Sequence, residues 1–372
     1  MTGKHDYSFL NGQHIILVRF AGELWIKSPR TRQRMLEILR RNILDILDPK
    51  MNSKILRFRG RFLLYSDTPV DHAEVASKIA RQVSGVSSVS PALVVQSSVD
   101  EIIKVGTTQS LKHIISQSSF AVRTRREGNH EFSSMEIAAA VGAEVLRQTG
   151  SGVRVDLENP DFEIYLDVRG PLTFIYDRIF TGIGGLPSYA QGTVLALIKP
   201  HYNSLLAAWL MQKRGTKIIP VFFKTGKPFE DEYLSFVKMQ FGSPVKIVSL
   251  KDTLASFPES PSFCLACELL CEAICKDLAE DLGISIGVAP TSFDFNQEKT
   301  SLDALKLLEQ GSSRWLMRPI QFGYLGEVLK SHIQDNTACC LYRDKVSLEV
   351  SENFDHEQLD EVIGLKTRLV SH

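Results

Sequence analysis

The chain has 372 residues and a mass of 41.7 kDa, a length that predicts two or three domains. Its 44% hydrophobic and 23% charged content is typical of globular proteins and excludes a wholly disordered chain. The 43 Lys and Arg residues balance 43 Asp and Glu residues, which argues against a uniformly basic nucleic-acid binder. The charge is nevertheless segregated. Residues 15–65 hold 12 basic and four acidic residues, a net charge of +8, whereas residues 271–372 hold ten basic and 17 acidic residues, a net charge of −7.

The sequence shows no apolar segment of the length that a membrane span or a secretory signal requires. Its longest apolar runs, 194–198 and 218–223, are far shorter than the ~20 residues of a spanning helix. Six Cys residues are too few for a disulfide scaffold, and four of them crowd into residues 264–275. We therefore expect a cytoplasmic protein that does not bind membranes.

The first 97 residues predict the order β-α-β-β-α-β. The predicted elements are a strand at 14–21, a helix from about 29 to 47, a strand or hairpin at 54–65, a helix at 71–82 and a strand within 83–95. In the stretch 54–65, basic and apolar residues alternate, which is typical of a half-exposed strand. This order predicts a ferredoxin-like domain.

The next segment predicts two helices and several strands before a hinge rich in Gly and Pro at 182–187. The predicted elements are helices at 99–116 and 133–149 and strands at 119–125, 153–157, 163–168 and 172–178. Ser133 and Glu136 have the spacing of a capping box, which predicts that the second helix begins beside Ser133.

Beyond the hinge, apolar strands alternate with helices. The predicted strands are 194–198, 217–223, 245–249 and 284–288, and the predicted helices are 204–214, 230–241, 263–282 and 303–309. Strands that are apolar throughout and alternate with helices indicate a doubly wound parallel sheet. The expected fold is therefore multidomain, with α+β and α/β parts.

Four segments in this order are similar to the tRNA 4-thiouridine synthetases, also called tRNA sulfurtransferases. They are RFAGELWIKSPRTRQRM at 19–35, FAVRTRREGNHEFSSMEIAAAVG at 120–142, RVDLENPDFEIYLDVRG at 154–170, and GIGGLP at 182–187 leading into VLALI. The resemblance covers nearly the whole chain. It implies an N-terminal ferredoxin-like domain at 1–97, a THUMP RNA-binding domain at 98–187 and a PP-loop pyrophosphatase domain, of the adenine nucleotide alpha hydrolase-like type, at 188–372.

The chain departs from that family at the phosphate-binding loop. The family carries Ser-Gly-Gly-x-Asp-Ser after the strand at 194–198, where this chain reads Lys-Pro-His-Tyr-Asn-Ser at 199–204. Glycines let backbone N–H groups approach phosphates at a helix N-terminus. Pro200 removes one N–H, and His201 and Tyr202 add bulk, so the PP-loop is degenerate. The alternative is a plain strand-to-helix turn with Asn203 or Ser204 as N-cap.

The resemblance implies ATP and Mg²⁺ as ligands, and the altered loop argues against their efficient use. By resemblance, the nucleotide-site positions are Leu197, Ile198, Ser204, Phe222 and Phe223. The resemblance also implies an iron–sulfur cluster for sulfur transfer, held by Cys264, Cys267 and Cys340, with Cys339 as an alternative third ligand. Soft thiolates suit such a cluster or zinc. A redox pair or inert thiols remain alternatives, and Cys271 and Cys275 are expected in the core.

The basic N-terminal residues and the THUMP strand are the predicted RNA-binding surface, because Lys and Arg neutralise phosphates. The candidates are Lys27, Arg30, Arg32, Arg34, Arg57, Arg59, Arg61, Arg123, Arg125 and Arg126. Arg57, Arg59 and Arg61 are spaced by two, which predicts that they project from one face of one strand. The resemblance implies that tRNA is the partner, recognised at its acceptor end.

Three functional hypotheses remain open at this point. The chain is a tRNA sulfurtransferase that forms 4-thiouridine by transferring sulfur to an adenylated uridine, a tRNA-binding accessory protein without ATP chemistry, or a cluster-dependent RNA-modifying enzyme that does not use ATP. A sulfur-donor protein or an active paralogue is the expected protein partner, and a homodimer is one assembly open to the chain.

Overall fold

The computed structural model describes residues 7–114, 118–200, 202–226, 230–242, 244–256, 263–289 and 316–317. The chain divides into two compact units, which meet in sequence between Gly184 and Gly185, inside the predicted hinge. The first unit comprises residues 1–32 and 39–184, and the second comprises residues 33–38 and the chain from Gly185 onward.

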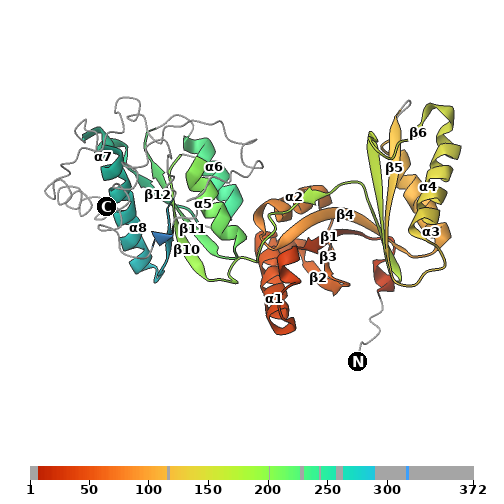
Figure 1. Cartoon of the computed structure of the whole chain (residues 1–372), viewed down its shortest axis with the longest axis horizontal. Coiled ribbons are helices and arrows are strands. Elements are labelled where there is room, and N and C mark those ends of the chain that lie inside the picture. The colour runs from red at the N-terminus through yellow and green to blue at the C-terminus, as the bar shows by residue number, and fades with distance from the viewer. Residues whose placement is uncertain are drawn as a thin grey trace. The chain divides into compact units, whose positions relative to one another are not determined.

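The first unit contains a nine-stranded sheet (Figure 1). Its strands are β1 (His14–Phe20), β2 (Ser53–Phe58), β3 (Arg61–Ser66), β4 (Val86–Gln96), β5 (Ser119–Glu127), β6 (Arg154–Val155), β7 (Phe162–Arg169), β8 (Leu172–Tyr176) and β9 (Phe180–Thr181). Its helices are α1 (Pro29–Ile46, apart from residues 33–38), α2 (His72–Gln82), α3 (Val99–Leu111) and α4 (Ser134–Thr149). The order β1-α1-β2-β3-α2-β4 confirms the predicted ferredoxin-like arrangement.

The long strand β4 belongs to both halves of this sheet, whose order is β2-β3-β1-β4-β8-β7-β5-β6. Along one edge β4 pairs with β1 from Val86 to Leu93. Along the other edge it pairs with β9 at Ser88 and Val89 and with β8 from Leu93 to Gln96. The ferredoxin-like and THUMP segments, expected as separate domains, therefore share one hydrogen-bonded sheet.

Local sequence signals account for the helix starts in this unit. Helix α1 has Pro29 at its first position, where the missing N–H costs nothing, and Ser28 as its N-cap. The Ser28 hydroxyl accepts a hydrogen bond from the Thr31 N–H at 3.4 Å. Helix α4 has the predicted capping box, in which Ser133 and Glu136 each accept a hydrogen bond from the other's backbone N–H.

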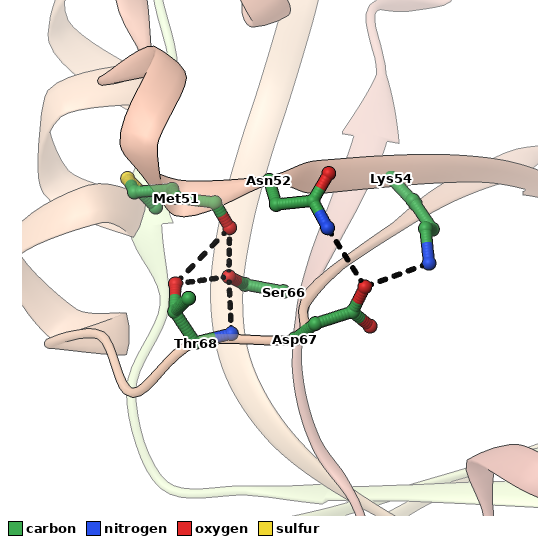
Figure 2. A network of polar contacts seen from close by, with 6 residues as sticks. All are labelled: Met51, Asn52, Lys54, Ser66, Asp67 and Thr68. Atoms are coloured by element: carbon green, nitrogen blue, oxygen red, sulfur yellow. Dashed lines mark hydrogen bonds and ion pairs between the residues drawn. The ribbon is translucent and has the colours of Figure 1, made fainter.

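The β2–β3 hairpin corrects the prediction that Arg57, Arg59 and Arg61 share one strand face. The chain reverses at Arg59 and Gly60, which both have positive φ, of 41° and 80°. At the far end of the hairpin, Asp67 accepts hydrogen bonds from Asn52 at 2.9 Å and from Lys54 at 2.7 Å, as Figure 2 shows. Ser66 and Thr68 both donate to the Met51 carbonyl beside them. The Lys54 cation is therefore neutralised within the hairpin.

The second unit is built on a five-stranded sheet of order β12-β11-β10-β13-β14, in which every pair is parallel. Its strands are β10 (Thr193–Ile198), β11 (Lys217–Lys224), β12 (Lys246–Ser249), β13 (Gly287–Val288) and β14 (Leu316–Met317). Its helices are α5 (Tyr202–Lys213), α6 (Glu230–Phe241), α7 (Lys251–Ser256) and α8 (Phe263–Asp281). Buried clusters lie on both faces of β10 and β11, as the predicted doubly wound sheet requires.

Two other sequence expectations can be compared with this fold. The short helix α7 was not predicted, and the helix expected at 303–309 lies outside the described residues. Within the described ranges, no helix combines the length and the apolar character needed to cross a lipid bilayer.

Candidate nucleic-acid interface

Strand β7 of the THUMP segment has two chemically different faces, because its sequence FEIYLDVR alternates. Ile164, Leu166 and Val168 are buried in the apolar cluster that also includes residues of α3 and α4. The other alternate residues are polar and carry the cluster described below. In the parallel ladder with β5, the pairs on this polar face are Arg123 with Tyr165, Arg125 with Asp167 and Glu127 with Arg169.

The centre of this polar face is Asp167, whose side chain is only 1% exposed. Its carboxylate accepts a hydrogen bond from Arg61 Nη2 at 2.7 Å and another from Arg169 Nε at 2.8 Å. Burial raises the pKa of Asp167, and the positive charges of Arg61, Arg19 and Arg125 oppose that rise. Four arginines therefore surround one buried carboxylate.

Burial and the neighbouring arginines also change the pKa of Arg169. Burial, followed by the nearby Arg61 cation, lowers the pKa of Arg169 to about 10. Glu127 supplies a second carboxylate to Arg169, so Asp167 and Glu127 are its two acidic partners. Even with both carboxylates counted, the cluster retains net positive charge, which favours a bound anion.

Arg19 extends the cluster onto β1. Its Nη1 donates to Ser90 Oγ at 3.0 Å and to Ser88 Oγ at 3.3 Å, while its guanidinium lies 4.7 Å from the centre of the Tyr176 ring. The Tyr176 ring stacks on Tyr165, with centroids 5.2 Å apart and planes 5° apart. Arg19 thus connects β1 to the Tyr176–Tyr165 stack.

A pocket of about 940 Å³ opens beside this stack, and its size suits a nucleotide. Its lining includes Arg19, Tyr165 and Tyr176. Small residues of α4 also belong to the lining, namely Ala138, Ala139, Gly142 and Ala143. Met135 and Leu157, which are 83% and 63% exposed, add apolar surface to the lining.

An open strand edge runs along the pocket. Strand β6 pairs with β5 only at Ser119 and Phe120, and among the described strands none covers that edge of β5 from Ala121 onward. Arg123, Thr124 and Arg125, on this open stretch, line the pocket. The hydroxyl of Thr124 is buried without a hydrogen-bond partner. The edge therefore offers backbone and side-chain hydrogen-bonding groups beside a basic, aromatic cavity.

The predicted RNA-binding arginines do not all lie on this surface. Arg61 is 8% exposed and is ion-paired with Asp167, so its position is that of a core residue. Arg123 is half-buried, pairs with Glu163 at 2.7 Å and donates to the Leu157 carbonyl at 2.8 Å. Near the end of β5, Arg125 and Arg126 are both exposed along the same open stretch.

The remaining basic candidates lie on the ferredoxin-like segment and on α1. Arg57 and Arg59 are on the β2–β3 hairpin, and the Arg59 guanidinium lies against Gly170, where an added Cβ would be 2.6 Å from Nη2. Arg30, Arg32 and Arg34 are in the first turns of α1, and Lys27 precedes it. Arg19, Tyr165, Asp167 and Tyr176 were not predicted, although the alternation of β7 was a visible signal for two of them.

Four of the five predicted nucleotide-site residues lie near the carboxyl ends of β10 and β11, and the fifth, Ser204, is in α5. Leu197, Ile198, Phe222 and Phe223 are at most 1% exposed and pack in the core. Ser204 is buried, and its Oγ accepts a hydrogen bond from the Lys199 N–H at 3.2 Å.

The loop itself is only partly described. Helix α5 begins at Tyr202. The alternative prediction, in which Asn203 or Ser204 is the N-cap of this helix, is therefore wrong. His201 lies outside the described residues. The absence of glycine from residues 199–204 is therefore known from the sequence alone. That this absence weakens the use of ATP remains a prediction.

The cysteines of α8 form a buried stripe. Cys267, Cys271 and Cys275 are at most 2% exposed and pack in the apolar cluster with Leu197 and Phe223, which confirms the core position expected for the last two. Cys264 is in the first turn of the helix, and its side chain is not described; Cys339 and Cys340 lie outside the described residues. No group of three potential metal ligands occurs in the described part of the chain. The described thiols thus do not themselves form a cluster site.

Family models match the first unit in two places. The ThiI ferredoxin-like domain matches residues 15–90, and the THUMP domain matches residues 96–177. A probable tRNA sulfurtransferase of Methanosarcina mazei is 38% identical over 217 residues, which cover 57% of this chain and 52% of that protein. One of Sulfurisphaera tokodaii is 34% identical over 212 residues, with 57% and 54% covered. Over these segments the chain is similar to tRNA sulfurtransferases.

The matched segments span about half the length of these curated relatives. Two solved structures extend the likeness of fold to most of the chain. PH1313 from Pyrococcus horikoshii is 25% identical, with a TM-score of 0.59, over 86% of this chain and 98% of that one. A 4-thiouridine synthetase, solved as an RNA complex with bound ATP, has a TM-score of 0.66 at 20% identity, over 96% and 97%. The fold predicted from the sequence is thereby confirmed.

Proposed function

We propose that this protein binds tRNA through its first unit and takes part in forming 4-thiouridine in tRNA. The observation that carries the proposal is the pocket beside β5, where Arg19 and Arg125 meet stacked tyrosines and an open strand edge. The names of the curated relatives and the RNA bound to the structural neighbour support the choice of tRNA.

The chemistry of the pocket suits a single-stranded end of RNA better than a duplex. Unpaired bases stack on aromatic rings and on guanidinium planes, and the partly buried Tyr165 ring, packed on Tyr176, lines the pocket. Arg125 lines the pocket and Arg126 follows it on β5, and both are exposed and available to neutralise phosphates. Small residues of α4 in the lining leave room for a base or ribose.

Salt-dependent tRNA binding tests this proposal. The double variant Arg125→Ala/Arg126→Ala should reduce the slope of log K against log salt by about 0.7–0.9 for each phosphate that the protein no longer contacts. Arg147→Ala is the matched control, because Arg147 is exposed on α4 and pairs with Glu144, three residues earlier. Equal slopes for the wild type and both variants would exclude Arg125 and Arg126 from the RNA interface.

A second candidate function is tRNA binding without adenylation of uridine. It is favoured by the loop 199–204, which lacks glycine, and by the Lys199 N–H, which already donates to Ser204. An N–H that is hydrogen-bonded within the protein is less available to a phosphate oxygen. Calorimetric titration with Mg-ATP, paired with thiolation of a tRNA transcript using sulfide, separates the candidates. Turnover supports the sulfurtransferase, whereas tRNA binding without ATP binding supports the accessory protein.

The predicted roles of Cys264, Cys267 and Cys340 call for a test of their own. Iron and acid-labile sulfide are measured after anaerobic purification of the wild type and of Cys264→Ser. A cluster held by these thiolates predicts stoichiometric iron in the wild type and its loss in the variant. Absence of iron from both would leave Cys267 as a core thiol, consistent with its packing.

A further inference from the structure

Two apolar side chains stand out on the basic ferredoxin-like segment. Between β1 and α1 the chain forms a short 3₁₀ helix, Gly22–Leu24, anchored by the fully buried Leu24. The next two residues, Trp25 and Ile26, are 45% and 80% exposed. Large apolar side chains seldom sit together in solvent without a binding role.

The Trp25 ring is held in place although it is exposed. Phe20 packs beside it with a centroid distance of 6.1 Å, and Gly60 of the β2–β3 turn lies so close that an added Cβ would be 3.1 Å from the indole. The Arg32 guanidinium lies 5.4 Å from the ring centre and donates to the Trp25 carbonyl at 3.4 Å. A ring fixed before binding loses little conformational entropy when a ligand stacks on it.

Positive charge surrounds this aromatic surface. Lys27 and Arg30 flank the start of α1, where the unpaired N–H groups of the first turn add positive partial charge. In the described ranges of the chain, neither side chain forms an ion pair. An aromatic surface bordered by uncompensated cations is the combination that binds unpaired nucleotides, because bases stack while phosphates are neutralised.

We propose that Trp25 and Ile26 form a platform on which an unpaired base of the bound RNA stacks, with Lys27 and Arg30 contacting the adjacent phosphates. The platform rests on the proposed RNA-binding function and adds to it a base contact outside the β5 pocket. A protein partner is disfavoured here, because it would have to bring acidic groups to both cations around an apolar centre. Arg32 continues the stack, since a planar guanidinium accepts a base as an aromatic ring does.

Binding of two RNA hairpins to the full-length protein tests the platform. One hairpin carries a single-stranded 3′ extension of mixed sequence, and the other has the same stem with a blunt end. Trp25→Ala should weaken binding of the extended hairpin about 5- to 150-fold, the range expected for the loss of one stacked base. Trp25→Phe should retain most of the affinity, and the blunt hairpin should respond little to either variant.

Two further measurements distinguish the loss of a base contact from a folding defect. Ile26→Ser changes a side chain that is 80% exposed, so it should keep the fold and still weaken binding of the extended hairpin. The extended hairpin should also quench tryptophan fluorescence in the wild type but not in Trp25→Phe. If the wild type binds the extended hairpin and both Trp25→Ala and Ile26→Ser bind it equally well, the platform is refuted while RNA binding stands. If the wild type binds neither hairpin, both proposals fail.

Discussion

Arg61→Met is the substitution that tests the buried charge cluster most directly. The Arg61 side chain is 10% exposed, and its Nη2 lies 2.7 Å from an oxygen of Asp167, which is 1% exposed. Methionine fills similar volume without charge, so the variant leaves the Asp167 carboxylate buried with Arg169 as its remaining direct partner. Removing one member of a buried ion pair costs about 3–5 kcal/mol. Because Arg169 still contacts the other oxygen, we expect the lower end, about 3 kcal/mol.

The cost should depend on pH. Burial already raises the pKa of Asp167, and loss of the nearest cation raises it further. A carboxyl group with a raised folded-state pKa gains its proton in the folded protein first, so the defect of Arg61→Met should shrink as the pH falls through that raised pKa. Adding Asp167→Asn removes the stranded charge and should recover more than about 1 kcal/mol of the loss at neutral pH.

Native-state hydrogen exchange of amides in β3 and β7 is the suitable assay, because a single melting temperature would mix the two compact units. Arg147→Met serves as control, since Arg147 is 70% exposed and its loss should leave these amides unchanged. Two results would refute the conclusion that Arg61→Met leaves Asp167 as an unpaired buried charge. One is a loss of stability that is the same at low and neutral pH, and the other is a double variant whose loss equals the sum of the two single losses.

Three smaller predictions concern the THUMP segment. Ser133→Ala removes the capping box with Glu136 and should destabilise α4 by about 1 kcal/mol, measurable by urea unfolding followed through exchange in that helix. Gly142→Ala should stabilise by about 0.5–1 kcal/mol, because an added Cβ meets no atom within 4 Å; a loss would show that the pocket wall tolerates no methyl group. Hydrogen bonds from Ser119 hold the pKa of Asp161 below its ordinary value, so Asp161→Ala should lower the hydrogen-exchange protection of β5 at neutral pH. That difference should vanish as the pH falls through the lowered pKa, and its persistence in acid would contradict the assignment.

Elements with local signals were predictable from the sequence. The ferredoxin-like order, the capping box at Ser133 and the parallel strands beyond residue 193 follow from periodicity, caps and apolar runs, and the structure confirms each. A hairpin at 54–65 was one of the two predictions, but the shared strand face expected for Arg57, Arg59 and Arg61 was wrong. Their spacing of two mimics a single strand across the turn at Arg59 and Gly60.

The candidate site was predictable in residue type but not in placement. Arginines on the THUMP strand were expected, and Arg125 does line the pocket. Arg61 looks the same in sequence, yet its partner Asp167 is 106 positions away, and no local pattern reports a pairing of that separation. The shared strand β4 was missed for the same reason, because its contacts with β8 join segments about 80 residues apart.

Because β4 pairs with both β1 and β8, it limits where the chain can be divided into fragments for expression. The two family matches end at residue 90 and begin at residue 96, so a cut placed between them would fall inside the strand Val86–Gln96. A THUMP fragment beginning at Gln96 would keep β8 but lose the neighbour of that strand, and its bare edge would invite self-association. A piece for independent expression should therefore keep the ferredoxin-like and THUMP segments together and extend to Gly184.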